Sequence, residues 1–537
     1  MTAPHRRTLP GEPLLFALLL ALHLALLWSF PFIPTQDGPG HQAVAFILRQ
    51  YDQPDAGLLR QYYRLNQEAL PNWFVFFLMS RVLSFVSVPM AEKILLTAYV
   101  LLLPLSVRYA LTAIDRRAAF LSILSFPFTY NFLFQMGFFN FCFSLAAFFF
   151  TLGFWLKHQE RMTPPRIAAL ALLILWVYFC HPVTLVMTVV ALFSLAGWRR
   201  LVEKGKLVAG ARRWLLAPVL ASLPALVLMA SFVGRRAGAA VSMLPLWAKV
   251  KHLAGLYSLA SLSRWTILLA GVLVLLFAVL TLVCLRARRW RPFAAGDGFL
   301  WLAAIFALIF FAAPSDLAGG GFINHRLNLF PFLALILWFA HFDHPAWRRR
   351  SIQLAAAGIS LAFLGVFAGL YARINADLAR IVAAGDRIEP DRTLLFLSYA
   401  HQGERRDGRP LVFRTEPFLH AGGYIAARKR LVDLSLYEAS ENYFPIYFEP
   451  RLDPYRHLAT VPLGIETEPP RIDLPGYQKR TGARVDYVLI WGLREDRRSE
   501  PAVGETLRRI AARYEEIWKA EEGKVNLYRR KKTGEGP

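Results

Sequence analysis

Twelve apolar segments, most of them long enough to cross a membrane as helices, fill the first 371 residues of this sequence. They lie at about 13–33, 71–88, 93–113, 118–134, 139–156, 166–180, 182–198, 214–234, 265–285, 298–313, 326–342 and 351–371. A helix needs about 20 predominantly apolar residues to cross a hydrocarbon core about 30 Å thick. Since 56% of the 537 residues are hydrophobic, the chain is too apolar for an ordinary soluble protein. The pattern predicts an α-helical polytopic membrane protein.

The formal net charge of +24 comes largely from short basic clusters between the apolar segments. These clusters lie at 115–117, 157–166, 198–213, 286–291 and 347–350. Such clusters are typical of cytoplasmic loops in a bacterial inner-membrane protein, which argues against nucleic acid as a partner. The basic N-terminus precedes a long apolar run without a cleavage pattern. It therefore predicts an uncleaved signal anchor whose N-terminus is cytoplasmic.

Segment 71–88 conflicts with this topology. If it crossed together with 13–33 and 93–113, the basic stretch 115–117 would face outside. The conflict disappears if 71–88 is a tilted or re-entrant helix on the outer side, beside a cavity, with Arg81 on a wet face. We therefore expect about eleven transmembrane helices, accompanied by juxtamembrane helices on the outer side.

The composition turns polar after Tyr371, and short patterned elements replace the apolar segments. "TLLFLSY" (393–399) and "VDYVLIWG" (485–492) predict buried strands, and a helix followed by a hairpin is predicted over 501–530. These elements predict a small α/β domain on the extracytoplasmic side. The expected division is a transmembrane domain at 1–373, whose first outer loop is 34–92, and the α/β domain at 374–537.

The stretch "PFIPTQDGPGHQ" (31–42) follows the first apolar segment and places Asp37 four residues before His41. Residues four apart share a helix face, and "DGPG" predicts a turn before a helix that begins at about His41. A carboxylate at the membrane boundary is costly unless it is used, so Asp37 and His41 are candidate catalytic residues. The alternative is that Asp37 caps the following helix.

Polar residues also interrupt two aromatic runs on the predicted outer side. The candidate substrate-binding residues are Tyr130, Asn131, Gln135 and Asn140 in "FTYNFLFQMGFFNF" and His181 in "YFCHPVTL". Amide groups bind sugar hydroxyls, and aromatic rings stack on a sugar or an isoprenoid chain. The alternative for the first run is a turn whose polar groups hydrogen-bond to one another, with aromatic residues at the membrane interface. The alternative for His181 is a purely structural role.

A late outer loop places an arginine where positive charge is unusual. Arg326 follows "GGGFINH" at the outer start of a membrane helix, whereas basic residues favour the cytoplasmic side and helix C-termini. An anionic partner such as a phosphate resolves this, because arginine binds phosphate in a bidentate manner. The candidate phosphate-binding residues are Arg326, His325, Arg235, Arg236 and Lys249. The alternative for Arg326 is an ordinary interfacial arginine. The alternative for Arg235, Arg236 and Lys249 is contact with anionic lipid.

A signal anchor, an acid in the first outer loop, many further spans, a late outer arginine and a soluble outer domain together resemble the GT-C superfamily of integral-membrane glycosyltransferases. The similarity is to the bacterial branch near protein O-mannosyltransferases and aminoarabinose transferases. Asp37 matches the early aspartate of this family, but a glutamine and a glycine flank it, so the frequent acid pair is missing. Asn131, Gln135 and Asn140 stand where many members carry a second acid.

The resemblance implies an inverting glycosyltransferase that uses a polyprenyl-phosphate sugar donor. Membrane lipids would be further partners of the protein. A glycan, lipid or protein acceptor would attack the anomeric carbon, with Asp37 as the general base. Arg326, assisted by Arg235, Arg236 or Lys249, would offset the charge on the leaving phosphate. No cofactor is firmly implied, because the missing acid pair does not support a divalent metal and the cysteine spacing fits no zinc site.

Two other classes of function stay open at this point. A transporter or flippase is one, although such proteins usually show paired halves and charges near the membrane midplane. A catalytically silent membrane scaffold is the other, and the missing acid pair favours it.

Overall fold

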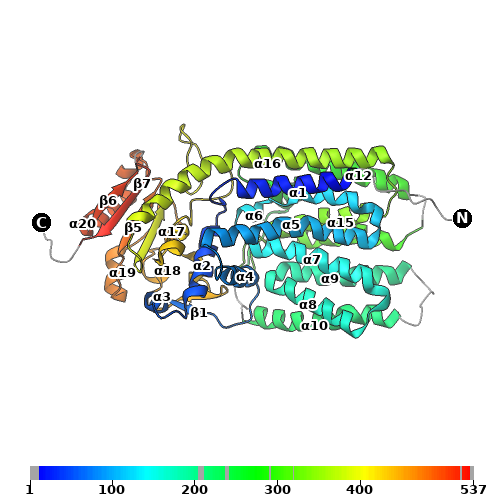
Figure 1. Cartoon of the computed structure of the whole chain (residues 1–537), viewed down its shortest axis with the longest axis horizontal. Coiled ribbons are helices and arrows are strands. Elements are labelled where there is room, and N and C mark those ends of the chain that lie inside the picture. Colours follow the sequence, from blue (N-terminus) through cyan, green and yellow to red (C-terminus); the bar gives the residue numbers. More distant parts are fainter. Residues whose placement is uncertain are drawn as a thin grey trace.

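The structure is a computed structural model that describes residues 11–202, 211–235, 241–289, 292–317, 320–520 and 523–531. A bundle of apolar helices forms one part of the elongated molecule, and a sheet with short helices lies at one end of the long axis (Figure 1). The N-terminal residues 1–10, on which the predicted cytoplasmic orientation of the first helix partly depends, lie outside the described residues.

Within the described ranges, seven helices are long and apolar enough to cross a membrane. They are α5 (Val88–Ile114), α7 (Phe139–His158), α9 (Pro182–Val202), α10 (Ala211–Gly234), α12 (Trp265–Arg288), α13 (Gly298–Ala312) together with the turn η4 (Ala295–Asp297) that precedes it, and α16 (Ala346–Ala383). Shorter apolar helices are α1 (Glu12–Trp28), α8 (Pro164–Cys180) and the consecutive pair α14 (Ile323–Leu327) and α15 (Leu329–Phe339). The prediction of a polytopic helical membrane protein is thereby confirmed.

The predicted span at 118–134 has an unexpected geometry. It forms a 3₁₀ helix, η1 (Arg116–Phe128), and then the short helix α6 (Phe132–Gln135). A 3₁₀ helix rises about 2.0 Å per residue, so thirteen residues extend about 26 Å, close to a hydrocarbon core's thickness. Residues 118–128 are all buried, and η1 packs against α5 and α16. This apolar segment is therefore the centre of the bundle.

Segment 71–88 contains only the nine-residue helix α4 (Phe74–Val82). Nine residues extend about 14 Å, too short to cross a membrane. The helix packs against α2 (Gly38–Gln50) between the bundle and the C-terminal sheet, and Arg81 is exposed (Figure 1). The expectation that this segment does not cross is confirmed.

The C-terminal region, defined here as residues 384–531, contains a mixed five-stranded sheet in the order β3-β2-β5-β7-β6. Its strands are β2 (Thr393–Ser398), β3 (Val432–Asp433), β5 (Tyr487–Trp491), β6 (Tyr514–Lys519) and β7 (Val525–Arg530). β2 pairs in parallel with β3 and β5, whereas β6 and β7 form the predicted antiparallel hairpin. The two predicted buried strands correspond to β2 and β5, in which every residue is buried.

Three connections fix the first loop and the C-terminal region against each other. β1 (Tyr63–Leu65), in the loop after α2, pairs with β4 (Ile446–Phe448) of the C-terminal region. α17 (Gly422–Lys429) packs on α2, and α16 continues unbroken from the bundle to the first turn of the C-terminal region (Figure 1). A site between the bundle and the C-terminal region is therefore built on rigid elements.

Candidate functional site

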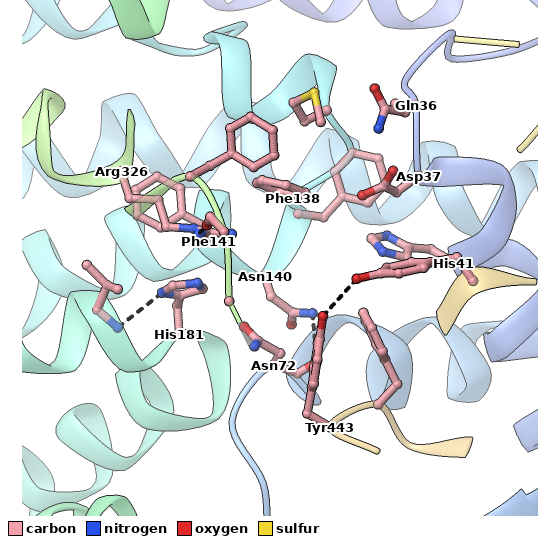
Figure 2. Close-up of a pocket in the computed structure, with 18 of the residues that line it drawn as sticks. Gln36, Asp37, His41, Asn72, Phe138, Asn140, Phe141, His181, Arg326 and Tyr443 are labelled. Atoms are coloured by element: carbon pink, nitrogen blue, oxygen red, sulfur yellow. Dashed lines mark hydrogen bonds between the residues drawn. The ribbon is translucent and has the colours of Figure 1, made fainter. Parts of the chain in front are cut away.

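A cavity of about 350 Å³ lies where α2, the ends of the bundle helices and the C-terminal region meet. We call it the central cavity. Five of the residues selected from the sequence line it, namely Asp37, His41, Asn140, His181 and Arg326. In Figure 2, Asp37 and His41 lie on one side of the view and Arg326 and His181 on the other, with phenylalanine rings between them. The volume falls in the range typical of small-molecule sites.

Backbone contacts fix the position of Asp37. The amide groups of Gln36 and Asp37 donate to the carbonyl oxygens of Gln135 (3.0 Å) and Met136 (3.1 Å). Gly137 adopts a positive φ of 88°, and a Cβ there would lie 2.9 Å from the Asp37 nitrogen. Only glycine permits this close approach without strain. The turn before α7 thus holds the Asp37 segment in place.

Asp37 stands at the N-cap position of α2, but its side chain makes no capping hydrogen bond. The helix begins at Gly38, three residues before the predicted start, because Pro39 is well tolerated in the first helical turn. The side chain lines the central cavity instead, where it is 15% exposed. The carboxylate of Asp37 is therefore available for chemistry.

The surroundings of Asp37 disfavour its charged form. Burial raises its pKa to about 8, and the negative charges of Glu466 and Glu416 act in the same direction. A contact with Gln36 and the positive charge of Arg326 oppose this shift. A carboxyl group with a pKa near neutrality is suited to general base catalysis.

The backbone amide of His41 donates to the carbonyl oxygen of Asp37 at 2.9 Å, but the side chain of His41 pairs with Glu438. Its Nε2 lies 3.7 Å from Oε1 of Glu438, and its ring meets the rings of Phe76 and Phe139 edge-on. Burial lowers the pKa of His41 to about 3, so the ring is neutral at physiological pH. Burial also raises the pKa of Glu438 well above its usual value. The pair is therefore an uncharged contact between α2 and the C-terminal region.

Arg326 is 9% exposed and does not extend to the protein surface. Its Nη1 donates a hydrogen bond to the carbonyl oxygen of Gly321, and its guanidinium lies 4.7 Å from the ring centroid of Phe138. The Nε atom is buried and has no hydrogen-bond partner among the described residues. Arg326 therefore places a buried positive charge with an unused hydrogen-bond donor at the wall of the cavity.

His181 separates α8 from α9 and lies on the same side of the cavity as Arg326 (Figure 2). Its Nδ1 accepts a hydrogen bond from the amide of Val183 at 3.2 Å. Because Nδ1 is the acceptor, Nε2 carries the proton of the neutral ring. His181 therefore offers a second hydrogen-bond donor near Arg326.

Three of the other predicted substrate residues, Tyr130, Asn131 and Gln135, do not line the cavity, because their side chains serve the fold. The Tyr130 hydroxyl donates to the carbonyl oxygen of His23 at 2.7 Å. Asn131 caps α6, and the Gln135 Oε1 accepts from the Tyr371 hydroxyl at 2.9 Å. Asn140 does line the cavity, but both ends of its amide hold the segment at 72–75.

Three of the predicted phosphate residues are also engaged elsewhere. Nε2 of His325 accepts a hydrogen bond from Arg414 at 2.8 Å. Lys249 is buried and donates to two carbonyl oxygens at the C-terminal end of α13, a favourable position for a cation. Arg235 pairs with Glu68 at 2.8 Å on a separate cavity. Arg236 lies outside the described residues.

The C-terminal region supplies a wall that the sequence did not predict. Its lining residues are Leu419, His420, Tyr437, Tyr443, Phe444, Leu463 and Glu466. Nε2 of His420 lies 3.8 Å from Oδ1 of Asp37, and the hydroxyl groups of Tyr437 and Tyr443 are 3.0 Å apart. The one sequence signal was the stretch "LYEASENYF" (436–444), which is rich in tyrosine and acid but has no helical or strand period.

We expect Gly423→Ala to disrupt the contact between α17 and α2. A Cβ at residue 423 would lie 2.4 Å from the carbonyl oxygen of Pro39, a backbone atom that cannot move aside alone. Overpacking of this kind typically costs about 1–3 kcal/mol. A thermal melt of the purified variant should show a clear decrease in melting temperature. Gly57→Ala is the control, because a Cβ there meets no atom within 4 Å; equal melting temperatures would contradict this packing argument.

No group of three or more His, Cys, Asp or Glu side chains in the described ranges is placed to hold a metal ion.

Comparisons with known proteins support the fold. No family model matches the chain, and no curated protein matches it. Among solved structures, the chain is similar to the apo crystal structure of ArnT from Cupriavidus metallidurans, with a TM-score of 0.57 and 12% identity. The match covers 98% of each chain. Both the bundle and the C-terminal region therefore share the fold of that structure.

Proposed function

We propose that the protein is a membrane glycosyltransferase that transfers a sugar from a polyprenyl-phosphate donor to an acceptor at the outer membrane face. The observation that carries this proposal is the central cavity, in which the uncapped carboxylate of Asp37 and the buried guanidinium of Arg326 face one space. The similarity to ArnT, whose fold covers the whole chain, supports the same class of enzyme. The proposed division remains a membrane domain up to residue 373 and an extracytoplasmic domain after it.

In the proposed reaction, an acceptor hydroxyl or amine attacks the anomeric carbon from the side of Asp37. Asp37 takes the acceptor proton as the new bond to carbon forms. The bond between the anomeric carbon and the phosphate oxygen breaks, and the phosphate leaves with the electron pair. Attack opposite the leaving group inverts the anomeric configuration.

The charge that develops on the leaving phosphate lies toward Arg326. The guanidinium supplies positive charge, and the Nε2–H group of His181 supplies a neutral hydrogen bond. We therefore propose that His181 binds the donor phosphate, whereas the sequence placed it among the substrate-binding residues. Apolar residues that line the cavity, among them Phe232, Val183 and Phe322, offer a surface for the isoprenoid chain.

The direct test is mass spectrometry of cell-envelope lipids and glycans from cells with and without the gene. The proposal expects one glycan or lipid to lose a single sugar residue, and the missing sugar identifies the donor. The purified protein should then transfer this sugar from its undecaprenyl-phosphate form. Transport of the lipid in liposomes without any sugar transfer would instead assign a flippase, and an unchanged envelope together with inactive protein would favour a scaffold.

We expect sugar transfer to depend on pH in the direction set by Asp37. The base must be ionised, and its pKa is raised to about 8, so the carboxylate fraction falls as the pH decreases below this value. The ratio kcat/KM should therefore rise about tenfold per pH unit up to about pH 8 and then level off. Measurement of kcat/KM between pH 5.5 and about 9.5 checks this; a profile that is flat or falling between pH 6 and about 8 would contradict it.

A further inference from the structure

A second cavity, of about 750 Å³, lies in the C-terminal region and has a polar lining. We call it the C-terminal cavity. Its titratable lining residues are Tyr399, His401, Glu404, Glu416, Glu466, Glu468, Arg494, Asp496 and Arg497. Glu466 lines both this cavity and the central cavity. The two cavities are therefore neighbours that share a wall.

Two buried histidines lie between Asp37 and the C-terminal cavity. Nε2 of His420 is 3.8 Å from Oδ1 of Asp37. Nδ1 of His401 is 3.8 Å from Oε2 of Glu416 and 3.9 Å from Oε2 of Glu468. His420 lines the central cavity and His401 lines the C-terminal cavity, and the proximity of His401 lowers the pKa of His420. Together these groups form a row of titratable side chains from one cavity to the other.

Exposure along this row is lowest in the middle and highest at its far end. The side chains of His420 and His401 are each 7% exposed, whereas those of Glu416 and Glu468 are 37% and 39% exposed. Nε2 of His401 is buried without a hydrogen-bond partner in the part of the chain that the structure describes. The row thus begins at Asp37, continues through the two buried histidine rings, and ends at the partly exposed carboxylates of Glu416 and Glu468.

A general base buried in this way needs a route for its proton. Asp37 must lose the acceptor proton before the next turnover, and its carboxylate lines the central cavity. Bound donor and acceptor would fill that cavity of about 350 Å³ and close the direct path to water. A separate path is therefore useful to the reaction.

We propose that His420 and His401 form a proton relay from Asp37 to Glu416 and Glu468 in the C-terminal cavity. The inference rests on the proposed function, because it assigns the route of the proton that Asp37 takes from the acceptor. Each ring accepts a proton on one nitrogen and releases one from the other, so one proton moves from the acceptor to water in each turnover. A water molecule or a small side-chain rotation bridges the 3.8 Å between Asp37 and His420 and the 3.8 and 3.9 Å from His401 to the two glutamates, and the step between the two rings requires a bridge of the same kind.

The charge state of His420 decides how the relay operates: the ring gains a proton from Asp37 on one nitrogen in the same step as it loses one from the other, so that no protonated ring is formed. Burial lowers its pKa to about 3, and the proximity of His401 acts in the same direction, so the ring is neutral at rest. A neutral ring has one free nitrogen and one N–H group, which is what a relay requires. The groups that face His420 are Asp37, His41, His401 and Tyr437, and those that face His401 are Glu416, Glu468 and His420.

The test compares His420→Gln, His401→Gln and the double variant with the wild type, in the full-length protein. His457→Gln is the matched control, because His457 lines neither cavity and binds the carbonyl oxygen of Pro450. The probe is the undecaprenyl-phosphate sugar that the wild-type protein turns over. The readouts are kcat, donor KM, the effect of added imidazole, and the kcat ratio in H₂O and D₂O.

We expect each single variant to lose about tenfold or more in kcat at unchanged donor KM, with partial recovery in imidazole. The double variant should lose little more than either single variant, because residues that act in series are not additive. The solvent isotope effect should increase in all three. The control should match the wild type in every readout.

Unchanged kcat in either single variant would overturn the relay while leaving the proposed function intact. The same conclusion follows if kcat and donor affinity fall together without rescue by imidazole, since that pattern indicates a structural role. A wild-type protein that binds undecaprenyl phosphate but transfers no sugar would overturn the proposed function, and the relay with it.

Discussion

Replacement of Asp37 by asparagine is expected to abolish sugar transfer while the protein folds and binds its donor normally. Asparagine has nearly the same shape, and the backbone bonds that hold this segment do not involve the side chain. It cannot accept the acceptor proton, however, and a positioned general base typically contributes about 10²- to 10⁴-fold. We therefore expect kcat to decrease by about this factor in an assay with the undecaprenyl-phosphate sugar.

Asp52→Asn is the control for this experiment. Asp52 follows α2 on an exposed turn, so the same chemical change there should leave kcat as in the wild type. The wild type, Asp37→Asn and Asp52→Asn should have the same melting temperature and the same affinity for undecaprenyl phosphate. Full activity of Asp37→Asn would remove Asp37 from the mechanism.

The second large effect is expected for Arg326→Gln. Loss of the guanidinium leaves the donor phosphate without its buried positive charge, and removal of one group that stabilises a leaving oxygen typically costs about 10²- to 10³-fold in rate. Binding of undecaprenyl phosphate alone, measured by titration in detergent, should weaken about 10- to 100-fold. Arg326→Lys should recover only part of this loss, because a lysine cannot bind the phosphate in a bidentate manner.

Arg81→Gln tests whether the effect is specific. Arg81 is also an arginine near the predicted outer boundary, but it is exposed and its guanidinium lies over the ring of Phe77. Its replacement should leave the phosphate affinity unchanged. Equal affinities of Arg326→Gln and the wild type would show that Arg326 serves the fold and not the donor.

Much of the fold followed from patterns that act locally. Hydropathy and basic loops predicted the apolar helices, and the conflict at 71–88 led to α4, a helix too short to cross. Short apolar runs predicted β2 and β5, and alternating residues on both sides of a turn predicted the final hairpin. The 3₁₀ geometry of η1 could not be predicted, because it depends on the packing of neighbouring helices around an apolar sequence that also suits an α-helix.

The site was predictable only in part. Asp37 and Arg326 could be found because a charge at the predicted outer edge of an apolar segment is unusual. Lys249 and His325 had the same appearance, but the structure gives them partners from distant segments, the end of α13 and Arg414. His420 and Glu466 were missed because they come near Asp37 only through the packing of α17 on α2 and the folding of the C-terminal region.

The most direct test of the account is a cryo-EM structure of the protein in nanodiscs with undecaprenyl phosphate. The account predicts density for the phosphate at the Arg326 guanidinium and His181 Nε2, with the space beside Asp37 left for the sugar. A phosphate bound elsewhere, with side chains filling the space between Asp37 and Arg326, would contradict it.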